Sequence, residues 1–217
     1  MSDNAAITPL RGALLLGLAG LLAAGLLAGL HEATRERIAM RGRQQALEHL
    51  SAVLPRARYD NDPIADTATL TDPRLGPGPH AIRRARRQGV PTAMAIEATS
   101  TDGYAGPIRL IVGIDLDGAI IGVRVLRHNE TPGLGDPIEA RRSRWIHGFD
   151  GRRIDDPSVE RWTVKPDGGD FDAFTGATIT PRAVIRAVRR TLEFHQSERD
   201  RLYALPPDGS ARPSQEP

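Results

Sequence analysis

Residues 108–125 read IRLIVGIDLDGAIIGVRV, and this stretch decides the fold class. On both sides of Asp117-Gly118, large apolar side chains recur at every second position. Alternation with a period of two is typical of a strand with one buried face, and Asp-Gly between two such runs is a strong hairpin signal. The wider stretch 107–127 is therefore predicted to be a half-buried antiparallel pair of strands.

The remaining elements follow from apolar periodicity and from turn residues. In chain order they are a loop over 60–80, two strands within 81–99 around Gln88-Gly89, a helix from Pro137 to about Gly148 capped by Asp136, a strand over 158–165, a turn at 167–169, and a helix from Pro181 to about Gln196. Strands and helices segregate rather than alternate. The predicted class is therefore α+β, with antiparallel strands and packed helices.

A cluster of arginines, Arg83, Arg84, Arg86 and Arg87, falls within the first of these strands. Such a cluster can mark a nucleic-acid patch. No aromatic residue is interleaved with it, and charged side chains usually stay exposed. We therefore predict a solvated strand face and no nucleic-acid partner.

An uncharged, leucine-rich stretch lies at residues 12–30, and it is long enough to cross a bilayer as a helix. A cleaved signal peptide is the alternative, but its apolar region is usually shorter. The predicted division is a short segment 1–11, a transmembrane helix 12–30, a helical stalk 31–58, a folded domain 59–197 and a flexible tail 198–217. Four arginines follow the span and only Arg11 precedes it, so the positive-inside rule alone would place the C-terminal part of the chain in the cytoplasm. Long domains cross a membrane largely regardless of charge, so the sequence leaves the orientation open.

The chain contains no cysteine, and its formal net charge is only +2. Disulfides, thiolate zinc sites, cysteine-ligated iron–sulfur clusters and c-type haem attachment are therefore excluded. A redox role would need a cofactor that requires no thiol.

The chemically informative stretch is residues 170–181, DFDAFTGATITP. Thr180 before Pro181 predicts a helix start, with a hydroxyl cap followed by a residue that needs no donor. Thr178, two residues earlier, is placed to hold a phosphate over the positive end of that helix. Gly176 and Ala177 leave room for a ligand near the backbone. Spacing alone favours a plain capped helix, because capping threonines are common.

A resemblance changes that balance. Asp172-x-x-Thr175-Gly176-Ala177-Thr178 resembles the flavinylation motif of the FMN-binding domain family. The resemblance implies that Thr178 forms a phosphoester with FMN, made by a separate flavin transferase. It also implies that Asp172, Thr175, Gly176 and Ala177 complete the motif that the transferase reads. One hypothesis gives Asp172 the task of orienting magnesium or the acceptor hydroxyl during attachment.

The wider chain is similar to the G subunits of the Rnf (Rsx) electron transport complexes. The similarity is densest at 103–106, at 130–136 and at 167–172. It implies a flavoprotein component of an ion-translocating oxidoreductase, anchored in a bacterial inner membrane beside other subunits. It also implies that residues 59–197 are its FMN-binding domain and that this domain lies in the periplasm. It further implies that Glu130, Thr131, Gly133 and Leu134 line the isoalloxazine. No residue is assigned a catalytic or metal-binding role.

Three alternatives remain. The FMN subunit of a sodium-translocating NADH:quinone reductase is of the same type, although the 130–136 loop resembles the Rnf version more closely. A hydrolase would use Thr178 with His147 or His195 as base, but no acid or oxyanion hole is evident. A non-catalytic periplasmic scaffold would carry no flavin.

Overall fold

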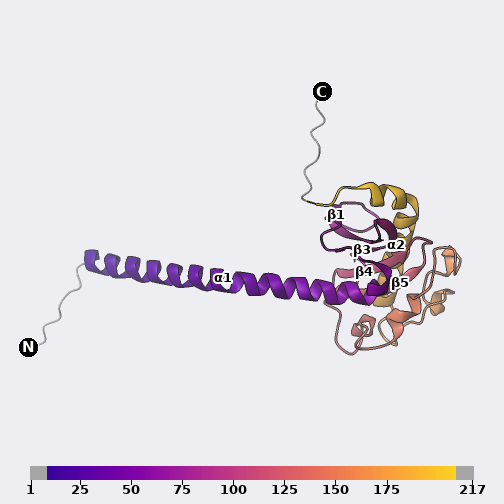
Figure 1. The fold of residues 1–217 in the computed structure, drawn as a ribbon. Helices are drawn as coiled ribbons and strands as arrows, with labels where there is room; N and C mark the ends of the chain where they lie inside the picture. The colour runs from indigo at the N-terminus through magenta and orange to yellow at the C-terminus, as the bar shows by residue number, and fades with distance from the viewer. Residues whose placement is uncertain (1–8, 209–217) are drawn as a thin grey trace, which may run out of the picture. The chain divides into compact units, whose positions relative to one another are not determined.

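The computed structural model describes residues 9–208, apart from the side chains of residues 9–11, 30 and 32–46. Two long helices and a five-stranded sheet make up its regular structure (Figure 1). The elements are α1 (Pro9–Val53), η1 (Arg56–Arg58), β1 (Thr67–Leu70), β2 (His80–Arg87), β3 (Val90–Ser100), β4 (Ile108–Asp115), β5 (Ile120–Arg127), η2 (Asp136–Ile138), η3 (Trp145–Phe149), η4 (Val159–Arg161), η5 (Lys165–Asp167) and α2 (Ile179–Ala204), where η denotes a 3-10 helix.

The N-terminal part of α1 carries the predicted apolar stretch. Gly12–Gly29, an 18-residue segment, is long and apolar enough to cross a membrane. At about 1.5 Å per residue it extends for about 27 Å, close to the thickness of a hydrocarbon core. Its leucine side chains are exposed, so they present an apolar surface. The prediction of one apolar N-terminal helix is confirmed.

The sheet is antiparallel throughout, with the strands in the order β1-β2-β3-β4-β5. Gln88 and Gly89 join β2 to β3 with positive φ values of 53° and 79°, and Asp115 receives turn hydrogen bonds between β4 and β5. Both predicted hairpins are therefore present. The sequence missed β1, whose short strand lies within the predicted loop over 60–80.

Both faces of the sheet are covered. On one face, side chains from β2 to β5 pack with α2 and the aromatic residues of the 145–171 region in the main core. On the other face, Leu50, Val53 and Leu54 pack against alanines of β2 and β3 and against Ile111. The prediction that the central hairpin is half-buried is therefore wrong. The end of α1 covers the second face of the sheet, which was predicted to be exposed to solvent.

The predicted α-helix over 137–148 is replaced by η2 and η3. Ser143 Oγ donates to the Pro137 carbonyl oxygen at 2.6 Å, so a side chain occupies the acceptor that an α-helical amide would use. Ile138, Ile146 and Phe149, apolar residues of this segment, are nevertheless buried in the main core. The prediction of an α-helix here is wrong, although the segment does pack on the domain.

The predicted strand over 158–165 is also wrong. The segment forms η4 and then η5, and its only ladder contact within the described chain is the bridge between Val164 and Phe171. Trp162 is buried there, with Nε1 donating to the Pro157 carbonyl oxygen at 3.1 Å. Packing of this indole against Phe149 and Phe171 takes precedence over strand propensity.

The C-terminal helix is longer than predicted, since α2 continues to Ala204 rather than ending near Gln196. Leu202 is buried in the main core, and this burial holds the last turns of α2 on the domain. The tail prediction is therefore wrong for 198–204, and its residues 209–217 lie outside the described part of the chain.

The domain also begins earlier than predicted. Residues from Glu48 onward form one compact unit with it, whereas the predicted boundary was at 59.

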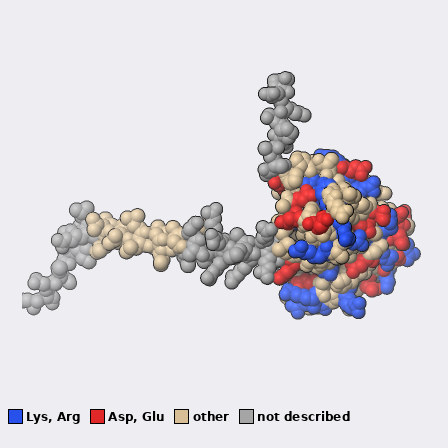
Figure 2. All heavy atoms as spheres, viewed as in Figure 1, with Lys and Arg blue, Asp and Glu red and all other residues tan. Residues whose placement is uncertain are grey.

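The arginine cluster on β2 is not a uniformly solvated face. Arg84 is fully buried, pairs with Asp66 at 2.6 Å, and donates to the carbonyl oxygens of Leu202 and Leu205. Arg83 pairs with Glu97 at 2.6 Å. On the face shown in Figure 2, acidic and basic side chains are interspersed, which matches the small net charge.

Candidate functional site

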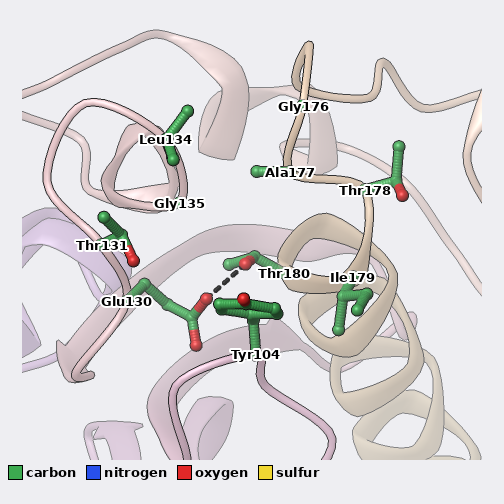
Figure 3. Close-up of a pocket in the computed structure, with 10 residues that line it drawn as sticks. All are labelled: Tyr104, Glu130, Thr131, Leu134, Gly135, Gly176, Ala177, Thr178, Ile179 and Thr180. Atoms are coloured by element: carbon green, nitrogen blue, oxygen red, sulfur yellow. Dashed lines mark hydrogen bonds between the residues drawn. The ribbon is translucent and has the colours of Figure 1, made fainter.

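A cavity of about 250 Å³ lies between the loop after β5 and the start of α2 (Figure 3). Three segments far apart in sequence line it. They contribute Tyr104, the loop residues Glu130, Thr131, Leu134 and Gly135, and the helix-start residues Gly176, Ala177, Thr178, Ile179 and Thr180. The lining is mainly small or apolar, with a few polar groups, as is typical of a cofactor site.

Glu130 is the buried carboxylate of this cavity, with 4% of its surface exposed. Its Oε1 accepts a hydrogen bond from the Ala105 amide at 3.0 Å, and its Oε2 accepts one from Thr180 Oγ1. A Cβ at Gly135 would lie 2.8 Å from the Glu130 Cβ, so only glycine permits this approach. Glu130 thus joins three segments of the wall, because buried carboxylates require hydrogen-bond donors.

A tight turn delivers the chain to the helix start. The Ala177 amide donates to the Phe174 carbonyl oxygen at 3.1 Å, and Gly176, the third residue of the turn, has a φ of 79°. That left-handed conformation strains any residue with a Cβ. Gly176 is therefore required by the turn that places Ala177 and Thr178 at the cavity.

Thr178 is the N-cap residue of α2, with φ −80° and ψ −20°. The predicted cap, Thr180, instead lies inside the first turn with 1% of its surface exposed, where its hydroxyl donates to Glu130. The cap prediction is wrong because a tertiary partner captures the Thr180 hydroxyl. Thr178 consequently lies closer to the positive end of the helix than predicted, and its side chain makes no capping hydrogen bond.

The Thr178 hydroxyl has a cationic neighbour. Arg182 Nη1 donates to Thr178 Oγ1 at 3.2 Å, while Arg182 Nε and Nη2 donate to the two oxygens of Asp167 at 2.6 and 2.7 Å. The hydrogen bond from Arg182 is the main reason that the pKa of Asp167 is lowered, so this carboxylate stays ionised. Thr178 Oγ1 is therefore adjacent to both a guanidinium and a helix N-terminus.

Aromatic residues hold the segment that precedes the turn. Trp145 Nε1 donates to the Asp172 carbonyl oxygen at 2.8 Å, and the Trp145 ring lies edge-on to Phe174 with centroids 5.1 Å apart. The Asp172 carboxylate points elsewhere, to Lys165 Nζ at 2.6 Å, and both side chains are exposed. Asp172 and Thr175 are thus presented at the surface, next to the cavity rather than in its lining.

The structure brings six of the nine predicted site residues into one cavity. These are Glu130, Thr131, Leu134, Gly176, Ala177 and Thr178. Gly133 lies in the same loop, where its amide donates to Asp136 Oδ1 at 2.7 Å, but it is not part of the lining. The prediction that Asp136 caps a helix is wrong, because η2 has no side-chain cap. The Asp136 carboxylate accepts the hydrogen bond from Gly133 instead.

Sequence reasoning did not assign Tyr104, Gly135, Ile179, Thr180 or Arg182 to the site. Tyr104 and Gly135 fall within the blocks that carried the family resemblance, so the signal for them was present. No sequence signal pointed to Arg182, because its partner Asp167 is 15 residues away and the pair forms only in the folded chain.

In the described structure, neither histidine of the hydrolase alternative lines the cavity or is hydrogen-bonded to Thr178. His195 is 17 residues further along α2, or about 25 Å at 1.5 Å per residue, and His147 pairs with Asp150 at 3.1 Å. The arrangement therefore offers Thr178 no imidazole base, and it resembles a binding site more than a hydrolytic one.

Comparison with known proteins defines the class first. Residues 103–193, which contain the sheet edge, the 130–135 loop and the start of α2, match the family model of the FMN-binding domain. Residues 1–53, which contain α1, match the model of the RnfG N-terminal region. An apolar N-terminal helix and an FMN-binding domain thus occur in one chain.

Relatives place the chain more narrowly. It is 45% identical over 199 residues to the G subunit of the ion-translocating oxidoreductase complex of Pseudomonas aeruginosa (strain UCBPP-PA14), covering 90% of this chain and 92% of the relative. The proteins of the same name from Cereibacter sphaeroides and Escherichia coli (strain K12) are 47% and 45% identical, covering 92% and 85% of this chain and 90% of each relative. The chain belongs to the family formed by the G subunits of ion-translocating oxidoreductase complexes.

Proposed function

We propose that this chain is the FMN-carrying subunit of an ion-translocating oxidoreductase complex, with the flavin phosphate esterified to Thr178. The observation that carries the proposal is the position of Thr178. It is the N-cap of α2, at the edge of a cavity, and its hydroxyl is within hydrogen-bonding distance of a guanidinium. Family membership supplies the cofactor class, because the domain that contains Thr178 matches the FMN-binding domain.

The residues present fit a flavin phosphate. A phosphodiester carries one negative charge, and Arg182 together with the N-terminus of α2 provides positive potential at Thr178. Pro181 has no amide hydrogen, so the first-turn donors free to meet an anion are the amides of Ile179 and Thr180. The negative Glu130 lies on the opposite wall of the cavity (Figure 3).

The remaining cavity suits a flat, partly apolar ring. Tyr104, Leu134 and Ile179 are exposed by 71%, 48% and 44%, so apolar surface surrounds the opening. A cavity of about 250 Å³ is smaller than the roughly 300 Å³ at which drug-sized ligand pockets begin, so a flavin held here would remain partly accessible. Accessibility is what electron exchange with other subunits needs.

The chemistry of electron transfer belongs to the flavin, which supplies one- and two-electron redox steps when bound. The chain's own residues hold and orient it. Glu130 and Thr180 fix the wall between the 130–135 loop and α2, and the turn at Gly176 fixes the approach to Thr178. Asp172 and Thr175 remain at the surface, where a flavin transferase has access to the motif.

We further propose that Gly12–Gly29 anchors the chain in the bacterial inner membrane beside other subunits of the complex, and that the FMN domain lies in the periplasm. The apolar helix and the relatives' names as complex subunits support the anchoring and the partners. In this arrangement a covalent bond prevents loss of the cofactor. The division into anchor, stalk, domain and tail stays a proposal, with two changes of boundary: α2 extends the domain to Ala204, and residues from Glu48 onward belong to the compact unit of the domain.

Mass and fluorescence test the proposal directly. The full chain, produced in cells that attach flavin, is expected to fluoresce on a denaturing gel and to weigh about 438 Da more than its amino acids, the mass of FMN less one water. Thr178→Ala is expected to lose both signals while retaining the unfolding temperature of the unmodified chain. Thr69→Ala, at an exposed threonine of β1 outside the cavity lining, is the control that keeps them. Flavin still bound covalently to Thr178→Ala would refute the attachment site.

A further inference from the structure

Arg182 is held in one orientation by Asp167. The guanidinium makes two hydrogen bonds to the carboxylate, from Nε at 2.6 Å and from Nη2 at 2.7 Å. Such a forked pair fixes the plane of the guanidinium as well as its position. The third donor used, Nη1, is thereby directed at Thr178 Oγ1 at 3.2 Å.

Asp167 is itself fixed by the backbone around it. It ends η5, and Gly168, the next residue, adopts a left-handed φ of 84°. Thr163 Oγ1 also lies 3.4 Å from Asp167 Oδ2. The Arg182 and Asp167 side chains are 35% and 38% exposed, so solvent weakens their electrostatic attraction. The main effect of the pair is therefore to fix the orientation of the guanidinium.

This geometry constrains the Thr178 hydroxyl. A hydroxyl has one proton and two lone pairs, and Arg182 Nη1 occupies one lone pair. The proton must therefore point away from Arg182, which leaves the other lone pair available for bond formation. The same N–H faces the ester oxygen once a phosphate has been attached.

We propose that Arg182, held by Asp167, is a positioning residue that orients Thr178 Oγ1 for flavin attachment and then donates a hydrogen bond to the attached phosphoester. The inference rests on the proposed function and assigns a task to two residues outside the Asp-x-x-Thr-Gly-Ala-Thr motif. In the attachment step, Thr178 Oγ1 forms a bond to phosphorus of an activated flavin phosphate anhydride. The anhydride P–O bond breaks, its leaving group departs with the electron pair, and the hydroxyl proton is released. No atom changes oxidation state, and one negative charge remains beside Arg182.

The test measures the rate of loading and the environment of the phosphate. The full chain is co-produced with a flavin transferase, and the fraction carrying the added flavin mass is followed over time for Arg182→Gln, Arg182→Lys and Asp167→Asn. Arg190→Gln is the matched control, because Arg190 is an exposed arginine two turns further along α2. Loaded proteins are then compared by phosphorus NMR at low and high salt.

Arg182→Gln is expected to slow loading about tenfold, the effect of losing one charge-assisted hydrogen bond. Arg182→Lys is expected to recover part of the rate, and Asp167→Asn to slow it less than Arg182→Gln. The phosphorus resonance is expected to move in Arg182→Gln and to become salt-dependent, with no change in Arg190→Gln. A purely structural role for Arg182 would leave the resonance unmoved.

Two outcomes overturn the inference in distinguishable ways. If Arg182→Gln and Asp167→Asn load at the wild-type rate with an unmoved resonance, the positioning role is wrong and attachment at Thr178 stands. If the wild-type chain gains no flavin mass, the proposed function itself fails. Should Arg182→Gln not fold, as judged by its unfolding temperature before loading, Asp167→Asn decides the question by the same two readouts.

Discussion

Thr180 Oγ1 donates a hydrogen bond to Glu130, and this contact joins residues 50 positions apart in the sequence. It connects the first turn of α2 to the loop after β5, so it sets the distance between two walls of the cavity. Both side chains are buried, which makes the contact costly to break.

Thr180→Val is expected to lower the free energy of unfolding by about 1.5–3 kcal/mol, because it removes a donor from a buried carboxylate. Denaturant unfolding of the full chain in detergent measures the change. A double-mutant cycle with Glu130→Gln is the control, since the two effects are expected to be non-additive. Additive losses would show that the contact contributes nothing of its own.

Arg84→Met is expected to destabilise the domain by about 3–5 kcal/mol, since it leaves a carboxylate and two carbonyl oxygens without their buried partner. Arg84 is fully buried and contacts Asp66 and the carbonyl oxygens of Leu202 and Leu205. Arg87→Gln, at an exposed arginine of the same strand, is the matched control and is expected to change stability by less than about 0.5 kcal/mol. Equal effects of the two substitutions would contradict the burial of Arg84.

Gly113→Ala is expected to cost about 1–3 kcal/mol or more, because a Cβ there would lie 1.9 Å from the Val53 carbonyl oxygen. The loss reports how closely the end of α1 packs on β4. Thermal unfolding measures it, with Gly148→Ala as the control, since no atom lies within 4 Å of a Cβ at Gly148. An unchanged midpoint in Gly113→Ala would mean that residues near Val53 do not pack on this strand.

His195 is expected to make stability depend on pH. Burial lowers its pKa from 6.5 to about 4, with a further lowering by Arg199 that Asp115 opposes. Between these two pKa values the unfolded chain binds more protons than the folded chain, so stability falls as the pH drops from about 6.5 to 4. Loss of about 3 kcal/mol across this window is expected from the difference in pKa.

His195→Gln removes the titrating group and isolates its contribution from that of the carboxylates. The difference in unfolding free energy between the wild-type chain and this variant is expected to shrink as the pH falls through the window. The stability curves of the two chains, measured from pH 7 to pH 4, give that difference directly. Parallel curves would show that His195 titrates normally in the folded chain.

The sequence correctly indicated the features that depend on near neighbours. Asp117-Gly118 and Gln88-Gly89 sit between strands because turn conformations are set within a few residues. The Gly12–Gly29 stretch was recognisable as a helix able to cross a membrane, because that criterion uses only local length and apolarity. The segment from Asp172 to Thr178 pointed to FMN by family resemblance, and its glycine has the positive φ that the turn requires.

Features that depend on distant partners were misread. Ser143 donates to the Pro137 carbonyl oxygen, and the segment predicted as a helix forms 3-10 helices. The Trp162 indole is buried and donates to the Pro157 carbonyl oxygen, and the segment predicted as a strand also forms 3-10 helices. Apolar periodicity encodes neither contact. Leu202 holds additional turns of α2 on the core, where sequence polarity predicted a tail. In each instance, tertiary packing took precedence over local preference.

By itself, the sequence determined the class of the domain, the apolar N-terminal helix and the threonine to which a flavin phosphate is proposed to attach. Only the tertiary structure decided that Thr178, rather than Thr180, is the N-cap of α2, and that Arg182 donates to the Thr178 hydroxyl. The physical reason is that a hydroxyl takes the strongest partner available. That partner is the buried Glu130 for Thr180, and it reaches Thr180 only when the sheet and α2 have packed together.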